Sequence, residues 1–551
     1  MSTSIVTLPS TGGSYSYSTL GTMVGDAADD TVTFTAALTG GTVDLGDGFD
    51  AIILSNSGSR LTISNVEAIT GGSGADSVTI DSALVGGSID LGSGNDRLVL
   101  SDADNTLTVT NIETIVGGAG NDTVTFGIGM LGASVDLRAG SDALALGGNG
   151  NRVTVSNVET ITGSTAIDTV TLGAAIVDGS IDLGAGNDRL ILGGFSNTVT
   201  LANVEVIVGV GGADNVTLAT AYAGTATVDL GSGNDTLVLG DFANTVTAAN
   251  VETVVGGVNA DTVALAAAIA NGSIDLGDGS DRLVLGNFSN TLTVTNVETL
   301  VGGTGADSVT LGTVYMGGES FNLGAGSDRL TLADGDNAVT LANIETIIGA
   351  AGDDTVTLGA VMTGGLVDLR GGTDTLVLAA GTNRITVSNV EALIAGSSAD
   401  TITLGTAFTD GTVDLGGGAD RLILGNTANT LTVVNVETVV GGSAADSVTL
   451  ASGYLSGERI DLQAGSDYLT LADTGNTVTA FNIESIMGGA GADTVALATA
   501  QATGSIDLGA GNDRLVLGNF SNTLTVTNVE TLVGGTGASS VSPSPKCVPN
   551  G

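Results

Sequence analysis

Apolar and polar residues alternate over short stretches along most of the chain. In segments such as 168–172 (DTVTL) and 96–100 (DRLVL), every second residue after the aspartate is apolar, which is the period of a β-strand with one buried face. These stretches are four or five residues long, and segments rich in Gly and Asn separate them. No helical periodicity or capping pattern of useful length occurs. The pattern predicts an all-β protein made of many short strands.

The strands belong to a long repeat whose copies follow one another at a period of 46 or 47. Its most regular motif is NVET or NIET, with small variations, and the residue two places before the glutamate is Asn in every copy. The residue eight places before it is also Asn, except at Ser59. Eleven copies in one register indicate a repeat array. The repeated glutamates are Glu67, Glu113, Glu159, Glu205, Glu252, Glu298, Glu345, Glu391, Glu437, Glu484 and Glu530.

Each repeat divides into a shorter half-unit, as from Asp30 to Asp50, and a longer one, as from Asp50 to Asp76, and each half-unit carries a Gly-rich turn that ends in Asp. Such units cannot bury an apolar face alone, so stacking must supply the core. The pattern predicts an elongated parallel β-solenoid, of the β-helix or β-roll kind, with one half-unit per coil and about 22 coils. The Asn columns suit left-handed corners and hydrogen-bonded ladders, and we expect the repeated glutamates to point into solvent.

The array occupies residues 30–538. Residues 1–29 are a degenerate lead-in that we expect to act as a cap. Residues 281–306 and 513–538 are identical, but the chain then diverges into a tail, 539–551, that holds three of the four Pro, the only Lys and the only Cys. We expect this tail to be disordered or to mark a truncated end.

Composition excludes several functions. Acids outnumber bases 59 to 13, for a formal charge of −46, which disfavours a nucleic-acid partner because phosphates require a basic surface. Abundant Ala, Val, Leu and Ile argue against disorder. With no His and one Cys, imidazole catalysis and thiolate metal clusters are excluded, so any metal must be a hard cation held by oxygen. Apolar runs are too short to span a membrane, and the N-terminus lacks a secretory signal.

The two Gly-Asp turns are the candidate functional elements. The shorter half-unit contains DLGxGxD, which we call the short turn, and the longer one contains GGxGxD, which we call the long turn. Stretches 71–79 (GGSGADSVT), 117–125 (GGAGNDTVT), 302–310 (GGTGADSVT) and 488–496 (GGAGADTVA) match GGxGxDxUx at every specified position. They resemble the RTX family of calcium-binding repeat proteins, whose nonapeptides stack into a β-roll.

The resemblance implies that glycine turns let backbone carbonyls approach Ca²⁺ while the Asp carboxylate completes an oxygen cage. It also implies export without an N-terminal signal, commonly by a type I system. One departure is that RTX nonapeptides run in tandem, two to a coil, whereas only one Gly-Asp turn occurs here in each half-unit. Another is that segments such as 164–168 have lost the glycines.

The candidate calcium ligands come from the best-preserved short and long turns. In the short turns they are Asp44, Gly46, Gly48, Asp50; Asp90, Gly92, Gly94, Asp96; Asp182, Gly184, Gly186, Asp188; Asp229, Gly231, Gly233, Asp235; Asp275, Gly277, Gly279, Asp281; Gly324, Gly326, Asp328; Asp414, Gly416, Gly418, Asp420; and Asp507, Gly509, Gly511, Asp513. In the long turns they are Gly72, Gly74, Asp76; Gly118, Gly120, Asp122; Gly303, Gly305, Asp307; and Gly489, Gly491, Asp493.

Together these observations predict a secreted or cell-surface calcium-binding repeat protein with a structural or adhesive role, able to self-associate through its ends or attach to a cell surface. A solenoid aligns equivalent carboxylates in columns, and divalent cations would relieve their repulsion. Alternatives are a metal-free S-layer or virion fibre subunit and, from the TxT triplets, an ice-binding solenoid. Enzymatic activity is not expected, because carboxylate pairs copied in eleven registers indicate architecture rather than a single catalytic pair.

Overall fold

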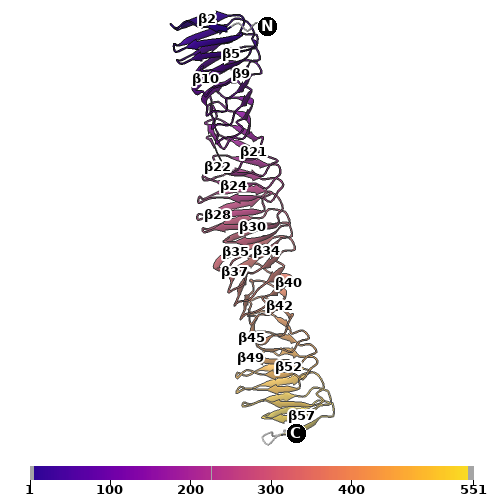
Figure 1. The fold of residues 1–551 in the computed structure, drawn as a ribbon. Helices are drawn as coiled ribbons and strands as arrows, with labels where there is room; N and C mark the ends of the chain where they lie inside the picture. Colours follow the sequence, from indigo (N-terminus) through magenta and orange to yellow (C-terminus); the bar gives the residue numbers. More distant parts are fainter. Residues whose placement is uncertain (1–4, 225, 544–551) are drawn as a thin grey trace. The chain divides into compact units, whose positions relative to one another are not determined.

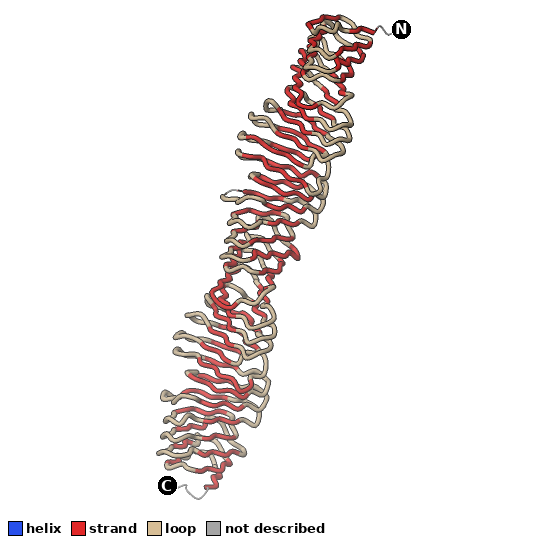
Figure 2. The backbone as a smooth tube through the Cα atoms, turned by 60° about the vertical axis from the view of Figure 1, so that its left-hand side comes forward, coloured by secondary structure: helices blue, strands red, loops and turns tan. Residues whose placement is uncertain are grey.

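The predicted parallel β-solenoid is confirmed, and the described residues contain no helix (Figures 1 and 2). The computed structural model describes residues 5–224 and 226–543. Contacts divide the chain into two compact units, 1–281 and 282–551, which we treat separately. Within these described residues no helix is long and apolar enough to cross a membrane.

Five short strands make up each repeat. In the first unit they are β5 (Thr39–Gly46), β6 (Ala51–Ile53), β7 (Arg60–Ser64), β8 (Ala68–Gly72) and β9 (Ser77–Ile80). The same five recur in the second unit as β45 (Thr409–Asp414), β46 (Arg421–Ile423), β47 (Thr430–Val434), β48 (Thr438–Val440) and β49 (Ser447–Leu450).

Each strand pairs in parallel with the strand two places further along the chain. Odd-numbered strands therefore form one sheet, the odd sheet, and even-numbered strands form the other, the even sheet. Paired residues lie one coil apart in the sequence, as for Leu61 with Val78 and for Met316 with Ala338. One coil is thus two strands and two corners.

The expectation of one coil per half-unit is wrong. The interval from Asp30 to Asp50 contains two strands, β4 (Asp30–Phe34) and β5, but the interval from Asp50 to Asp76 contains three, β6, β7 and β8. A repeat is therefore two and a half coils, and the molecule has about 27 turns rather than about 22. Because five is odd, equivalent turns fall on opposite edges in successive repeats.

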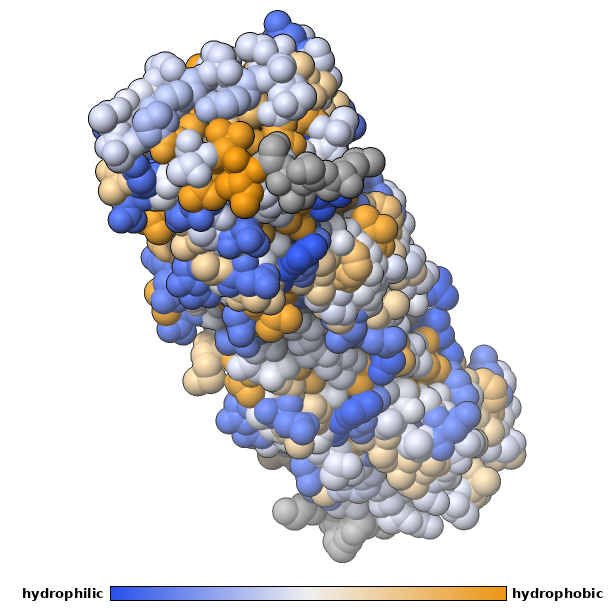
Figure 3. Space-filling model, turned by 45° about the horizontal axis from the view of Figure 1, so that its top comes forward, coloured by the Kyte–Doolittle hydropathy of each residue, from blue (hydrophilic) through white to orange (hydrophobic). Residues whose placement is uncertain are grey.

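The core lies between the two sheets. Along the odd sheet, Leu98, Ile115 and Val135 pair in register on successive coils and are fully buried. Alternation within each strand sends the intervening residues outward. On the face visible in Figure 3, apolar and polar residues are interspersed, with one apolar group near the N-terminal end. The core is thus a set of aliphatic columns, one coil per layer.

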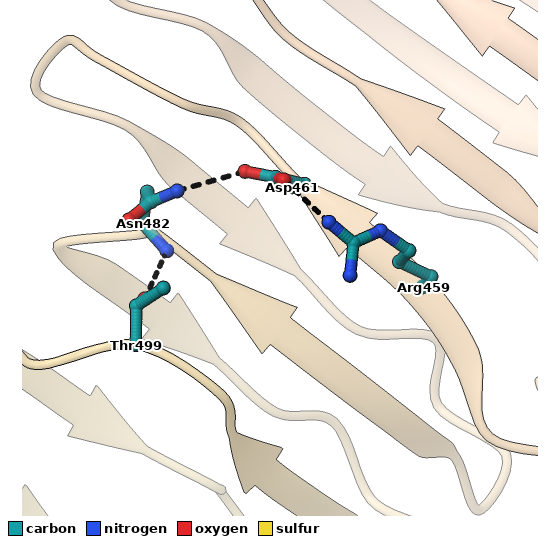
Figure 4. Close-up of polar contacts among 4 residues, drawn as sticks. All are labelled: Arg459, Asp461, Asn482 and Thr499. Carbon is teal, nitrogen blue, oxygen red and sulfur yellow. Dashed lines mark hydrogen bonds and ion pairs between the residues drawn. The ribbon is translucent and has the colours of Figure 1, made fainter. Parts of the chain in front are cut away.

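The NVET asparagines occupy left-handed corners, as the sequence predicts. All eleven have φ between +50° and +54°, a region in which Asn is favoured over most residues. Their Nδ2 groups donate to the leading residue of the short turn on the preceding coil, which is Asp in most copies and Asn322 in one. Figure 4 shows one example: Asn482 donates to Asp461 Oδ1 at 2.8 Å, and its backbone N–H donates to Thr499 Oγ1 at 2.7 Å. These contacts join the corner to the preceding coil and to the following one.

The ends of the described chain are also strands. In the lead-in, β1 (Ile5–Thr7) pairs with β3 (Thr22–Asp26), and β2 (Gly13–Tyr17) pairs with β4. In the tail, β59 (Ser540–Pro543) pairs with β57 (Thr523–Thr527). The remainder of the expected cap and tail, residues 1–4 and 544–551, lies outside the described residues.

Candidate metal sites in the corner turns

Both edges of the solenoid carry a column of hydrogen-bonded side chains, which we call the corner ladder. Its members are the residues at the starts of the strands, and a polar member accepts a hydrogen bond from the backbone N–H of the member one coil earlier. In one stretch, Asn105 N–H donates to Asp122 Oδ1 at 3.0 Å, and Asp122 N–H donates to Asp142 Oδ1 at 2.7 Å. Asp142 N–H then donates to Glu159 Oε2 at 2.9 Å.

The ladder follows a fixed order along each edge: an apolar residue, Asn, long-turn Asp, short-turn Asp and Glu. The apolar member Met130 donates its N–H to Asn151 Oδ1 at 2.9 Å, which begins the next series. A buried backbone N–H needs an acceptor, and the ladder supplies one at the corners. The two Gly-Asp turns of a repeat are therefore stacked neighbours, and three other corners separate each pair from the next on the same edge.

Two long-turn aspartates, Asp122 and Asp168, have hydrogen bonds at both carboxylate oxygens. The other nine keep a buried Oδ2 without a hydrogen-bond partner among the described residues. Asp122 is fully buried, and its Oδ1 accepts both the backbone N–H and the side-chain Nδ2 of Asn105. The same double contact joins Asp214 to Asn197. Glycine is needed here because the coils approach closely: a Cβ on Gly120 would lie 2.5 Å from the carbonyl oxygen of Ala103. Through Oδ1, the long-turn aspartate thus ties its turn to the preceding coil.

Ten short-turn aspartates likewise leave one carboxylate oxygen without a hydrogen-bond partner among the described residues. Asp142 is 2% exposed, its Oδ1 accepts the Asp122 N–H, and its Oδ2 has no hydrogen-bond partner among the described residues. A buried carboxylate oxygen without a partner is costly. The short-turn aspartates with this orphaned oxygen are Asp50, Asp96, Asp142, Asp188, Asp235, Asp328, Asp374, Asp420, Asp467 and Asp513.

Glycine geometry places further oxygens beside these carboxylates. A Cβ on Gly94 would lie 2.8 Å both from Asp96 Oδ1 and from the carbonyl oxygen of Gly74 on the preceding coil. The space that the missing side chain leaves is therefore lined by a carboxylate and a turn carbonyl. The first Gly position of the short turn has positive φ in all eleven copies, including those occupied by Arg138, Arg370 and Gln463 at +67°.

Burial raises the pKa of most short-turn aspartates. For Asp142 burial is the largest cause and raises the pKa to about 6, and the neighbouring carboxylates Asp122 and Glu159 raise it further against the opposing Asp122 N–H bond. A pKa of about 6 with burial as the first cause is found for Asp50, Asp96, Asp142, Asp188, Asp328, Asp374, Asp420 and Asp467.

These pKa values predict the pH dependence of the metal-free protein. Because the folded state binds protons more tightly than the unfolded chain, whose carboxyls titrate near pH 4, folding takes up protons between about pH 4 and pH 6. The free energy of unfolding should then be highest near pH 4 and fall as the pH rises through 6. Thermal unfolding in EGTA at pH 4.5, 5.5 and 7 measures this. A stability that rises over this interval would contradict the assignment.

The leading aspartates differ from the turn aspartates. Asp90 Oδ1 accepts from Asn111 Nδ2 at 2.8 Å and from the Gly92 N–H at 3.0 Å, and the other leading positions repeat the Asn contact. The structure thus places each candidate short turn as one loop, in which the leading carboxylate is engaged by a corner Asn. Only the final aspartate presents a buried, orphaned oxygen.

The repeated glutamates are ladder members, so the expectation of purely solvated carboxylates is wrong. Glu113 Oε2 accepts the Asp96 N–H at 2.8 Å, and Glu67 does the same for Asp50. The constant separation of 17 between the short-turn Asp and this Glu is the signal in the sequence that marks two residues one coil apart. Arg459 forms an ion pair at 2.7 Å with Asp461, the leading aspartate of a short turn (Figure 4).

Within residues 5–224 and 226–543, no three His, Cys, Asp or Glu side chains converge on a point suited to a metal ion. A cation in a short turn would therefore bind one carboxylate together with backbone carbonyls. No family model and no curated protein matches the chain. Fold and corners together define a structural repeat protein of the parallel β-solenoid class.

Proposed function

We propose that the chain is a calcium-binding structural protein of the cell surface or extracellular space, in which Ca²⁺ binds in the short turns. The observation that carries this proposal is the buried Oδ2 without a hydrogen-bond partner at ten short-turn aspartates. Nine long-turn aspartates share this feature, but most of them also accept an Asn Nδ2 donor at Oδ1, which the short-turn carboxylates lack. An ionised carboxylate in such a place requires a compensating charge. Ca²⁺ is a hard cation with flexible oxygen coordination, and it suits a carboxylate flanked by turn carbonyls.

The oxygen atoms of the short turn are of the kinds that Ca²⁺ prefers as ligands. In the turn that ends at Asp96, the donors are the Asp96 carboxylate and the facing Gly74 carbonyl. The division of each repeat into two and a half coils also makes the average coil about two nonapeptides long, which agrees with the coil that the RTX resemblance implies. The departure in the number of turns remains, because two Gly-Asp turns are distributed over two and a half coils.

An extracellular location follows from this chemistry. Extracellular calcium is abundant and cytosolic calcium scarce, so a chain stabilised by many Ca²⁺ ions would complete its folding after export. Export by a type I route and an adhesive role are the parts of the proposal that rest on the RTX resemblance. A long array of equal corners suits a spacer that holds a surface away from the cell.

Calcium dependence of stability tests this proposal. We expect the midpoint of thermal unfolding at pH 7 to rise by at least 10 °C when millimolar CaCl₂ replaces EGTA, because a ligand that binds only the folded state stabilises it by about 3 kcal/mol per site at a hundred times its Kd. MgCl₂ at equal ionic strength is the control, and we expect it to have a much smaller effect, because Mg²⁺ demands octahedral geometry. Equal midpoints in CaCl₂ and EGTA would refute calcium binding.

A metal-free structural solenoid, such as an S-layer or fibre subunit, is the second candidate. It is favoured because the Oδ1 of every short-turn aspartate already accepts a backbone N–H from the preceding coil. In that case the eight short-turn carboxyls with a pKa of about 6 would stay protonated in the folded state up to about that pH, and the protein would be most stable in mildly acidic surroundings. The thermal unfolding measured in EGTA would then be the same as that measured in CaCl₂ at each pH.

A further inference from the structure

Arginines on the outer face of the even sheet of the second unit lie in one column. Arg384 of β42 (Arg384–Ser388) pairs in register with Thr401 of β44 (Thr401–Leu404), which pairs with Arg421 of β46. Arg421 pairs with Thr438 of β48, which pairs with Arg459 of β50 (Glu458–Asp461). Five consecutive coils thus present Arg, Thr, Arg, Thr and Arg at the same position, which we call the arginine column.

The column is exposed and carries three positive charges, while the half-exposed Glu437 and Glu458 directly precede Thr438 and Arg459 in the chain. All three arginines are exposed, and the two threonines are half-exposed. The next outward positions on the same strands are mostly uncharged, namely Thr386, Thr403, Ile423, Val440 and Asp461. The single acid of this group, Asp461, is already paired with Arg459, whose guanidinium also lies 3.6 Å from the ring centroid of Phe481.

Two guanidinium groups are therefore without an ion-pair partner among the described residues, Arg384 and Arg421. Their position explains this: the acids of the edges are used by the corner ladder, in which Asp400, Asp420 and Glu437 are tied to backbone amides. Arginine forks are suited to bidentate contact with planar anions such as carboxylates. The column offers these forks at a regular spacing, with a hydroxyl between them.

We propose that the arginine column binds a linear acidic polysaccharide that lies across the strands of the even sheet. Adjacent coils are about 4.8 Å apart, so the arginines repeat at about 10 Å, a spacing that suits one carboxylate per disaccharide. The intervening threonines supply hydroxyls for the uncharged sugar. A nucleic acid fits less well, because its phosphates follow at about 3.4 Å along each strand, and so dense a polyanion is repelled by a chain of charge −46.

Shorter columns of the same kind occur in the first unit. On the odd sheet, Arg60 pairs with Ser77 and Ser77 pairs with Arg97, and Thr169 lies between Arg152 and Arg189 in the same way. Each places two exposed arginines on alternate coils around a hydroxyl residue. The three-arginine column is the longest, and we expect it to bind most tightly because a polymer engages its sites together.

Binding of the full-length chain to fluorescein-labelled hyaluronan, which carries one carboxylate per disaccharide, tests this inference by fluorescence anisotropy. The test variant is R384T/R421T, because Thr occupies the same positions in other repeats, at Thr106 and Thr236. The matched control is R138Q/R370Q, which removes the same charge from turns where Gln463 shows that Gln is accommodated. We expect the test variant to weaken binding at least tenfold and the control to change it less than twofold.

Three results would overturn the inference: no binding by the wild-type chain, equal weakening in the two variants, or tighter binding of oligo-dT with the same dependence on Arg384 and Arg421. Unchanged thermal unfolding verifies that the variants are folded. The inference rests on the adhesive part of the proposed function by naming its partner, but not on calcium. Measuring hyaluronan binding in CaCl₂ and in EGTA distinguishes failure of this inference from failure of calcium binding, since polymer binding can persist in a chain whose stability does not depend on calcium.

Discussion

Replacing Asp122 with Ala is expected to lower the free energy of unfolding by about 2–4 kcal/mol, because a buried donor left without its charged acceptor costs about 1–3 kcal/mol. The Asp122 carboxylate accepts the backbone N–H and the Nδ2 of Asn105, and at 3.4 Å the N–H of Gly118. Urea unfolding of the purified chain in CaCl₂ measures the loss. Hydrogen exchange should show faster opening of the coils that contain Asn105 and Asp122, because each coil contacts only its neighbours.

Asp102→Ala is the matched control for this prediction. Asp102 is an exposed acid in the corner that contains Asn105, and its loss removes the same charge from the same region. We expect a change below about 0.5 kcal/mol. If the two substitutions have equal effects, net charge rather than the corner ladder determines the stability of the edges.

Replacing two short-turn aspartates, as in D142N/D188N, should have opposite effects with and without calcium. The amide keeps an oxygen for the N–H of Asp122 and of Asp168, contacts of 2.7 and 2.6 Å in the wild type, but it cannot ionise. In EGTA at pH 7 the variant should be at least as stable as the wild type, because no buried charge forms. In CaCl₂ its free energy of unfolding should lack the contribution from calcium binding, about 3 kcal/mol per site at a hundred times the Kd.

The control for this pair is D81N/D102N, which neutralises two exposed acids outside the Gly-Asp turns. It should behave like the wild type in both buffers. A short-turn variant that is equally destabilised in EGTA and in CaCl₂ would show that the carboxylates act only as hydrogen-bond acceptors. That outcome would favour the metal-free solenoid.

Alternation and periodicity predicted the strands, the parallel solenoid and the left-handed asparagine corners. The coil count was wrong because the interval from Asp50 to Asp76 holds three strands. The NVET segment forms a corner between two of these strands, although it contains no Gly-Asp turn. The separation of 17 from Asp50 to Glu67 contained this information, since it is one coil. Its meaning emerges only when the register of the sheets is known.

The sequence also could not predict how the aspartates of the short and long turns differ in their hydrogen bonds. Asp122 and Asp142 end similar motifs, yet the Asp122 carboxylate accepts from the side chain of Asn105 whereas the Asp142 carboxylate accepts only a backbone N–H. That difference depends on which corner precedes each turn in the stack, and so on the odd number of strands per repeat. The exposed arginine column arises from the same register, because Arg384, Arg421 and Arg459 come from different repeats and different sequence contexts.

The number of calcium ions bound per chain tests the central claim most directly, namely that the short turns hold the metal. Equilibrium dialysis of the wild type against ⁴⁵Ca²⁺ at pH 7 should give about ten ions, one for each short-turn aspartate with an orphaned buried oxygen, and D142N/D188N should bind about two fewer. A wild-type chain that binds no calcium, or a variant that binds as many ions as the wild type, would contradict the claim.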